Sequence, residues 1–517
     1  SSPATEGITI SLTATQSLSP PTSRVSGNAL IIEIPNAMLS LTDETVAEQF
    51  GPAEGLALVQ VSAVSGDRVQ VVITGSEAVP TVQIGETSGN LVLSVVPGIA
   101  LVSEAVGDVD SEDEAIRLTV TAATRTEASP LDVPQSIQVI PRDVIEARGV
   151  NNLTDALRSV PGVTPNFNSA LFNDVVIRGF SADFRRDGLN NFVPGSASIQ
   201  TANIERLEIL RGPASVLYGQ GSFGGTVNVI TEQPTDEPFY RVEASAGSFD
   251  LYRGAIDLSG PLDEDETVKY RLNIAAETEN SFIDDIGRDR LLVAPVLSWA
   301  VGEDTDITFE LEYSELTADN NFGIPVRGTI LDNVNGEISR SRYIGDADRE
   351  FRDINTLIVG YDVEHRINDD WEISNAYQFT SRQAPEFTVS GYELLADERT
   401  LERDYLEVTR FDTYSHLLET NIVGRFNTGS IEHELLAGVE ISFDRSPGEG
   451  SFGLANSIDL FSPDDDELVL EPIDDVFQDE FSNRSLGIYL QDRIDILDNL
   501  TLLLGGRFDI ATARFED

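Results

Sequence analysis

The sequence predicts a mainly β protein in three parts: a small N-terminal β-sandwich, an α+β domain and an antiparallel transmembrane β-barrel. Residues 1–98 show short alternating strands separated by Gly, Asn and Asp turn signals. Residues 114–238 mix short amphipathic helices with strands. From residue 239 onward, strands of about ten residues alternate apolar and polar side chains and are joined by connections of alternating length.

The N-terminal part contains only strand and turn signals. Ile8, Ile10 and Leu12 alternate with polar residues, and the apolar run 30–34 is stopped by Pro35. Further apolar runs lie at 69–73 and 91–95, each after a turn signal, which predicts a small sandwich. Residues 99–113 are acidic and lack periodicity, so we expect an extended, self-repelling linker there.

The second part begins its first helix at a proline. Pro141 stands at the start and Gly149 just past the end of the predicted helix. Leu153, Ala156, Leu157 and Val160 follow at helical spacing and predict a second short helix. Strands are expected at 175–177, 204–210 and 226–230. These elements together predict a compact α+β domain.

The third part contains eleven alternating stretches, and its connections decide between a soluble sheet and a membrane barrel. Short connections take turns with long ones, and a transmembrane barrel needs this asymmetry because one rim carries tight turns and the other carries functional loops. The stretches lie near 239–247, 251–259, 267–277, 290–300, 305–315, 356–366, 371–380, 414–426, 431–441, 484–495 and 500–510. The long connections are 278–289, 316–355, 381–413 and 442–483.

Composition excludes several classes of protein. The net charge of −54 over 517 residues repels nucleic acid and anionic lipid headgroups, so nucleic-acid binding and peripheral membrane binding are not expected. No apolar run reaches the roughly 18 residues that a membrane helix needs. The sequence has no cysteine, and its three histidines, His365, His416 and His433, fall on separate strands, so no metal site is predicted.

Two further patterns are interpreted as structural. Residues 219–224 fit the Gly-rich dinucleotide motif, but a β-branched run follows where that motif needs a helix, so we reject a nucleotide site. The acidic runs 464–466 and 474–475 are more often a solvated loop surface than a calcium site. No nucleophile, base and orienting group cluster in the sequence, so neither an enzyme nor a cofactor is predicted.

Five motifs in the second part carry a specific resemblance. They are Val133–Pro141, Leu153–Leu157 with Val160–Val163, Ile177–Phe180, Asp187–Gly188 and Ile204–Gly219. In this order they resemble the plug domain of TonB-dependent receptors, and weaker motifs such as Gly487–Asp492 extend the resemblance to the end of the chain. The resemblance implies a plug at 123–238 inside a barrel of about 22 strands, of which 239–517 would form about half.

The same resemblance implies the roles of individual residues. Residues 114–122 resemble the TonB box, which pairs as an added strand with an energy-coupling partner; Arg117 departs from the apolar residue usual there. The partner-binding residues would be Ile116, Arg117, Leu118, Thr119, Val120 and Thr121. Ligand would be touched by Phe167, Asn168, Phe184, Arg185, Asn191 and Phe192 in the upper plug loops. The plug would be locked by Arg178, Glu205, Arg206 and Arg211, facing polar or acidic groups of the barrel wall.

The first part resembles the AMIN domain. The resemblance rests on Gly27–Leu30, Ile34–Ala37, Pro52–Gly55 and Leu93–Pro97. It implies a periplasmic β-sandwich at 1–98 that contacts peptidoglycan; the alternative is a generic sandwich without a specific ligand.

The resemblances imply an outer-membrane receptor whose plug and N-terminal domain reach the periplasm. The expected function is active import of a ferric siderophore, with a TonB-type coupling protein and outer-membrane lipid as partners and no cofactor. The alternatives are a receptor for cobalamin, haem or a glycan, and a porin or adhesin without energy coupling. Eleven strands is an odd number and Asp517 is not an aromatic terminus, so we also expect the natural gene to continue for about as many strands again.

Overall fold

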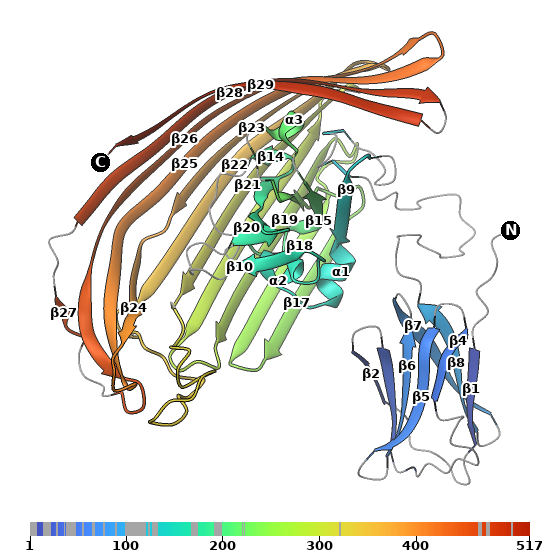
Figure 1. Ribbon diagram of the computed structural model, residues 1–517. Coiled ribbons are helices and arrows are strands. Elements are labelled where there is room, and N and C mark those ends of the chain that lie inside the picture. The colour runs from blue at the N-terminus through green and yellow to red at the C-terminus, as the bar shows by residue number, and fades with distance from the viewer. Residues whose placement is uncertain are drawn as a thin grey trace. The chain divides into compact units, whose positions relative to one another are not determined.

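The structure is a computed structural model, and its contacts divide the chain into two units, residues 1–116 and 117–517 (Figure 1). The described residues are 8–13, 22–26, 29–35, 37, 48–53, 56–64, 68–75, 78–87, 90–98, 120–121, 125–126, 133–166, 174–190, 199–212, 214–219, 221, 223–319, 322–463, 468–471, 476–497 and 500–516.

The first unit is a β-sandwich, as predicted. One sheet has the order β1 (Ile8–Thr13), β8 (Asn90–Gly98), β7 (Ala78–Thr87). The other has the order β2 (Thr22–Ser26), β3 (Ala29–Pro35), β6 (Arg68–Gly75), β5 (Leu56–Val64), β4 (Glu48–Ala53). Val95 of the smaller sheet shares one buried core with Ile32 and Val71 of the larger sheet.

The second unit begins with the predicted α+β domain. A five-stranded sheet has the order β14 (Leu189–Asn190), β13 (Asp183–Arg186), β16 (Gly225–Thr231), β15 (Ile204–Arg211), β9 (Ser136–Pro141). Beside it are α1 (Arg142–Ala147), α2 (Leu153–Leu157), α3 (Ser215–Tyr218) and the small sheet β10 (Val163–Asn166), β11 (Asp174–Ile177), β12 (Phe180–Ser181). α1, α2 and both sheets share one hydrophobic core, whereas Leu217 and Tyr218 of α3 pack with Leu436 and Tyr489 of the large sheet.

Local sequence explains where the two predicted helices begin and end. Pro141 precedes α1 with φ −77°, and Gly149 follows its end with φ +60°, a value that favours glycine. α2 is capped by Asn152, whose side chain accepts a hydrogen bond from the Asp155 N–H over 2.9 Å. The predicted apolar face of α2 is buried.

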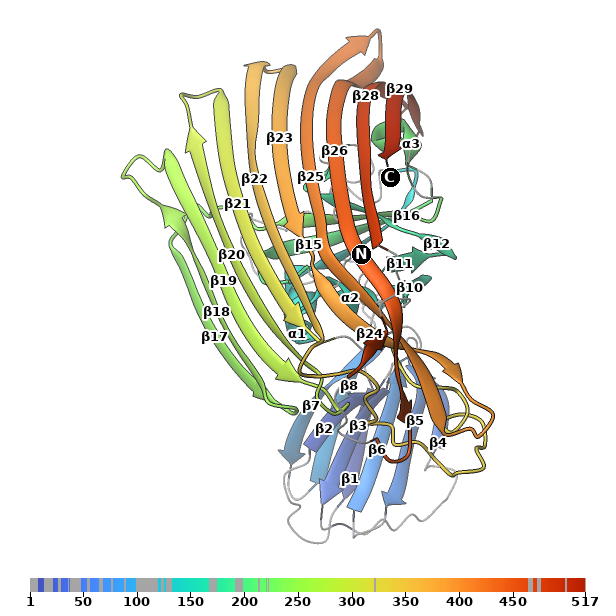
Figure 2. The same ribbon diagram turned by 90° about the vertical axis from the view of Figure 1, so that its left-hand side faces the viewer.

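The rest of the second unit is one large antiparallel sheet that curves around the α+β domain (Figures 1 and 2). Its main path has eleven strands, one for each predicted stretch, so that prediction is confirmed. They are β17 (Phe239–Gly247), β18 (Leu251–Pro261), β19 (Val268–Asn280), β20 (Gly287–Ala300), β21 (Thr305–Ala318), β22 (Phe351–Asn368), β23 (Trp371–Gln383), β25 (Thr400–Thr428), β26 (Ile431–Asp459), β28 (Val476–Leu497) and β29 (Leu500–Glu516).

The predicted long connections 381–413 and 442–483 are wrong in part, because much of them is strand. β25 and β26 each run for 29 residues, and β24 (Glu386–Leu394) and β27 (Leu470–Glu471) pair with this extension. The alternation of apolar and polar residues ends where the strands leave the lipid-facing part of the sheet, whereas backbone pairing continues beyond it. The sequence pattern therefore predicted only the lipid-facing part of each strand and missed the strand ends.

Each strand presents one apolar face and one polar face. On β28, Ile488 and Leu490 are about half exposed on the convex face, whereas Tyr489 between them is buried against the α+β domain. On β26, Val439 and Ile441 face outward and Glu440 faces inward. No helix among the described residues is both long and apolar enough to cross a membrane.

Candidate functional site

The chain enters the α+β domain through a buried contact at Val120 and Thr121. Val120 is fully buried and packs with Val133 and Leu210. The Thr121 backbone N–H and Oγ1 both donate to Oε2 of Glu208, over 3.1 and 3.3 Å. Thr121 is the last of the expected coupling residues, so the end of that segment is held on strand β15.

Glu208 is a buried carboxylate whose charge is balanced within the domain. Arg206 donates from Nε to its Oε1 over 2.9 Å, and Asn228 donates to its Oε2 over 3.3 Å. An unpaired buried charge costs several kcal/mol. Arg206 and Asn228 remain bonded to Glu208 when Thr121 moves away. The Thr121 contact can therefore open without leaving the buried Glu208 carboxylate unpaired.

Arg125 joins the same segment to the wall of the large sheet. Its backbone N–H donates to the Thr121 carbonyl over 2.8 Å in a tight turn, where Arg125 has φ +57°. Its guanidinium donates to Glu440 on β26 over 3.1 Å and forms an ion pair with Glu419 on β25. The Arg125 side chain is 4% exposed, so this is a buried ion-pair cluster.

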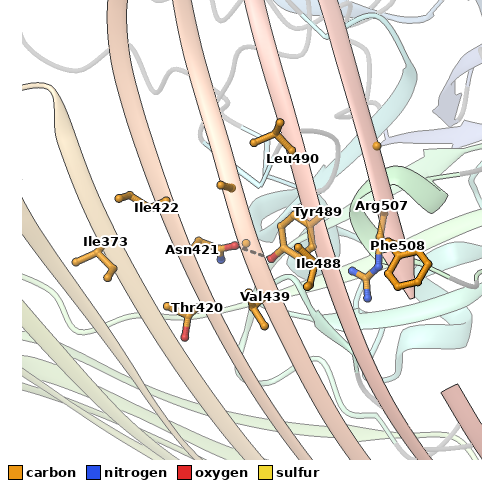
Figure 3. Close-up of a pocket in the computed structure, with 13 residues that line it drawn as sticks. Ile373, Thr420, Asn421, Ile422, Val439, Ile488, Tyr489, Leu490, Arg507 and Phe508 are labelled. Carbon is orange, nitrogen blue, oxygen red and sulfur yellow. Dashed lines mark hydrogen bonds between the residues drawn. The ribbon is translucent and has the colours of Figure 1, made fainter. Parts of the chain in front are cut away.

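Two tyrosines complete the surroundings of Arg125. Its guanidinium carbon lies 4.9 Å from the ring centre of Tyr218 on α3 and 4.6 Å from that of Tyr489 on β28. Arg125 also donates to the Tyr489 hydroxyl over 2.5 Å. That hydroxyl in turn donates to Asn421 over 2.5 Å, the contact drawn in Figure 3. The cation is thus held by carboxylates and by aromatic faces.

The carboxylates at this point are shared with a third strand. Glu440 also accepts from Arg507 on β29 over 2.9 Å, and Arg507 donates to the Leu217 carbonyl of α3 over 2.9 Å. Burial by itself lowers the pKa of Arg125, but Glu419 and the other groups around it raise that pKa above its ordinary value. Arg125 therefore stays charged, and removing it leaves Glu419 buried without this cation, at a cost of about 3–5 kcal/mol.

Three other polar side chains of the α+β domain bind carboxylates of the sheet. Arg186 on β13 donates to Glu312 over 2.7 Å and to Glu310 over 3.2 Å, both on β21. Asn203 donates to the same Glu312 over 2.7 Å. Asn151 donates to Glu277 on β19 over 2.8 Å. These contacts anchor the domain to two further strands besides those of the Arg125 cluster.

The residues expected to lock the plug have different partners from those expected. Arg206 pairs with Glu205 and Glu208, and Arg211 contacts Ser136 and Gln138, all within the α+β domain. Arg178 lies exposed at the turn after β11 with φ +52°. The printed partners of Arg206 and Arg211 lie within the α+β domain, and contact of these side chains with the wall stays a prediction.

The other expected site residues are only partly described. Phe184 and Arg185 lie on β13 rather than on an open loop; Phe184 packs on the domain core and Arg185 is 2% exposed beside Tyr218. Val120 and Thr121 are described above. Outside the described residues lie Ile116, Arg117, Leu118, Thr119, Phe167, Asn168, Asn191 and Phe192, as well as the acidic runs 464–466 and 474–475.

Sequence reasoning missed the Arg125 cluster. Its members Arg125, Glu419, Glu440, Tyr489 and Arg507 are up to 382 positions apart in the sequence, and only strand register brings them together. One signal was present. Glu419 and Glu440 are charged residues inside strands of otherwise membrane-like pattern, and such residues are expected to face the interior of a barrel.

A domain anchored by buried ion pairs inside a curved membrane-type sheet defines a plugged outer-membrane barrel. Comparisons agree: residues 129–226 match the family described as TonB-dependent Receptor Plug Domain, and residues 298–517 match the family described as TonB dependent receptor-like, beta-barrel. Residues 2–95 match the AMIN domain. The chain belongs to the TonB-dependent receptors, which are outer-membrane proteins, and it carries an N-terminal AMIN domain.

Individual relatives support this assignment. The metal-pseudopaline receptor CntO of Pseudomonas aeruginosa is 33% identical over 403 residues, which cover 75% of this chain and 55% of the receptor. The ferrichrome outer membrane transporter/phage receptor of Escherichia coli K12 is 27% identical, with 75% and 56% covered. A crystal structure of the P. aeruginosa ferripyoverdine receptor bound to ferripyoverdine has a TM-score of 0.70 at 25% identity, covering 84% of this chain and 59% of that one. The chain spans about half the length of the curated relatives that it matches.

Proposed function

We propose that this receptor imports a ferric siderophore across the outer membrane and that a TonB-type protein drives the import by pulling on the segment that ends at Thr121. The substrate class is supported by the relatives, which are named as receptors for ferrichrome, ferripyoverdine and metal-pseudopaline. Relatives of this family are transport receptors, and we propose that the chain has no catalytic step of its own.

The observation that carries the proposal is the pair of anchors within six residues of each other. Thr121 is tied to Glu208 of the plug, and Arg125 is tied to Glu419 and Glu440 of the barrel wall. A segment N-terminal to Val120 that pairs as an added strand on the partner's sheet transmits force first to Thr121 and then to Arg125. Opening the Arg125 cluster separates plug from wall at strands β25 and β26.

The order of opening follows from the order of the two anchors along the chain. The Thr121 contact consists of two hydrogen bonds to a carboxylate, each worth about 1.5–3 kcal/mol. The Arg125 contact is a buried ion-pair cluster, whose disruption costs about 3–5 kcal/mol, so the two anchors are of similar strength. A partner that pulls from the N-terminal side loads Thr121 first and therefore releases it before Arg125. We infer that the first step frees the segment and that the second loosens the plug.

The test is uptake of radiolabelled ferric siderophores by cells with and without the gene. Ferrichrome, a pyoverdine and a pseudopaline-type chelate loaded with iron or with other metals form the panel, because the relative at 33% identity is named for metal-pseudopaline. The proposal predicts accumulation of at least one ferric chelate that depends on the gene. Uptake confined to cobalamin, haem or a glycan would contradict the substrate class. For the AMIN domain we propose contact with peptidoglycan, tested by cosedimentation of residues 1–116 with purified cell wall.

A further inference from the structure

Arg185 on β13 is a buried cation that uses only part of its hydrogen-bonding capacity. The residue is 2% exposed, and its Nη2 donates to the Tyr218 carbonyl over 3.2 Å. Its Nε and Nη1 are also covered, yet neither has a hydrogen-bond partner among the described residues. A buried guanidinium normally has partners for its donors, because an unsatisfied buried donor is costly. Two donors of Arg185 are therefore available for another contact.

Strand register places Arg185 in line with the first anchor of the coupling segment. Arg185 pairs with Asn228 on β16, and Asn228 pairs with Glu208 on β15. Side chains in such a row share one face of the sheet and are neighbours. Glu208 is the carboxylate that holds Thr121. Arg185 therefore stands on the sheet face that the segment contacts.

Arg185 also lies close to the second anchor. Its guanidinium carbon is 4.6 Å from the ring centre of Tyr218, and that of Arg125 is 4.9 Å from the same point. The two guanidinium carbons are thus no further apart than the sum of these distances. Burial lowers the pKa of Arg185, Glu440 opposes this shift, and the charge of Arg125 adds to it. Arg185 is therefore attracted by the wall carboxylate and repelled by the cation already bound there.

Withdrawal of Arg125 affects the two wall carboxylates unequally. Glu440 keeps the donation from Arg507 over 2.9 Å. In the described part of the chain, Glu419 has no ion pair with another arginine and keeps the Asn421 amide, which donates to its Oε1 over 2.8 Å. A buried carboxylate that loses its cation is strongly destabilised. Glu419 therefore needs another cation when the segment leaves.

We propose that Arg185 is a reserve cation, which moves to Glu419 and Glu440 when Arg125 is withdrawn. The proposal rests on the proposed function, in which a partner pulls the segment, and it gives Arg185 a positioning role in that step. The move uses the two donors that have no partner in the resting state, and it follows the loss of the repelling charge. Arg185 then limits how far the plug separates from β25 and β26 after the segment leaves.

A merely structural role for Arg185 predicts a different behaviour. An arginine that only supports the Tyr218 carbonyl contributes the same amount whether Arg125 is present or absent. A reserve cation contributes most when Arg125 is absent. The two roles therefore differ in the coupling between substitutions at Arg125 and Arg185, and a double-mutant cycle measures that coupling.

The rate of maleimide labelling of a cysteine at Ala214 reports plug opening in the purified receptor. The 517 residues contain no cysteine, and Ala214 packs on the cluster that joins α3 to β26 and β28. Arg125→Gln and Arg185→Gln together should raise the labelling rate about tenfold above the product of the two single effects. This factor is a coupling of about 1.4 kcal/mol, which is typical of members of one ion-pair network. Effects that simply multiply would overturn the proposal.

Two further variants show whether the cation itself is responsible. In the Arg125→Gln receptor, Arg185→Lys should keep most of the protection that Arg185→Gln removes, because the positive charge is retained. The matched control is Arg382→Gln, since Arg382 on β23 is 1% exposed and also has two unpartnered guanidinium nitrogens among the described residues. Arg382 pairs with Thr413, six residues or about 20 Å along β25 from Glu419. Its effect should multiply with that of Arg125→Gln.

A crystal structure of the Arg125→Gln receptor tests the movement without the double variant. Arg185 should donate there to Glu419 or Glu440. An Arg185 that still contacts only the Tyr218 carbonyl would overturn the proposal. Neither measurement requires a coupling partner or a siderophore. Either can therefore fail while gene-dependent uptake persists, and a failure of uptake leaves both results standing.

Discussion

Arg125, where the chain enters the plug, donates to Glu440 of the barrel wall over 3.1 Å. Arg507 donates to the other oxygen of Glu440 over 2.9 Å and also reaches the Leu217 carbonyl of the plug. The Glu440 carboxylate therefore links the segment that contains Arg125 to the contact between the wall and the plug.

Arg125→Gln should release the segment from the wall. The substitution leaves Glu419 and Glu440 buried without this cation, at a cost of about 3–5 kcal/mol. A spin label at Thr126 should become mobile in the absence of any coupling partner. Arg158→Gln is the control, because Arg158 is an exposed arginine that pairs with Asp155 of α2. An immobile label in Arg125→Gln would show that the ion pairs do not hold the segment.

Thr121→Val should weaken only the first anchor. It removes the Oγ1 donation to the Glu208 carboxylate but keeps the backbone N–H donation, so the loss is about 1.5–3 kcal/mol. The purified C-terminal domain of a TonB-type partner should then bind about 13- to 160-fold more tightly, because less free energy is needed to free the segment. Isothermal titration measures this change. Weaker or equal binding would contradict the proposed order of opening.

Leu118→Pro should abolish uptake and leave siderophore binding intact. Proline removes a strand donor and fixes φ, so the segment cannot pair as an added strand. Leu118→Val keeps both the donor and the β preference and serves as the control. Uptake at the unaltered rate in Leu118→Pro would refute the assignment of 116–121 as the coupling segment.

The loop 319–350 should be held more weakly as pH rises. Glu350 accepts from Tyr343 and from the Val389 N–H of β24, and burial, with Asp319 nearby, raises its pKa to about 8. A carboxyl whose folded pKa exceeds its unfolded value of about 4.5 contributes most below pH 4.5. That contribution is lost as pH rises through 8.

Hydrogen exchange at the loop amides of residues 341–349, corrected for the intrinsic rate, checks this expectation; the Val389 amide is left out because its own bond favours the ionised carboxylate. Protection should fall between pH 5 and pH 8 in the unaltered receptor. In Glu350→Gln it should be flat over the same range, because the amide does not titrate. Arg403 and Arg352 also act on Glu350 and are kept in both proteins. A flat profile in the unaltered receptor would contradict the burial effect.

The sequence pattern predicted the strands because one face of each strand contacts lipid and the other faces the plug. Apolar and polar side chains therefore alternate along the strand. The eleven strand cores, the helix start at Pro141 and the buried face of α2 were all readable for that reason. α3 was not predicted, since four residues are too few for a helical pattern. The Arg125 cluster was not predicted either, because it depends on the register of β25, β26, β28 and β29 and not on local sequence.

The most direct test of the account is the energy dependence of iron uptake. A radiolabelled ferric siderophore is supplied to cells that carry the receptor, before and after a protonophore collapses the proton gradient. The account predicts accumulation only in energised cells, surface binding alone after collapse, and competition by the gallium chelate in both states. Equal accumulation with and without the gradient would contradict it and would identify a passive barrel.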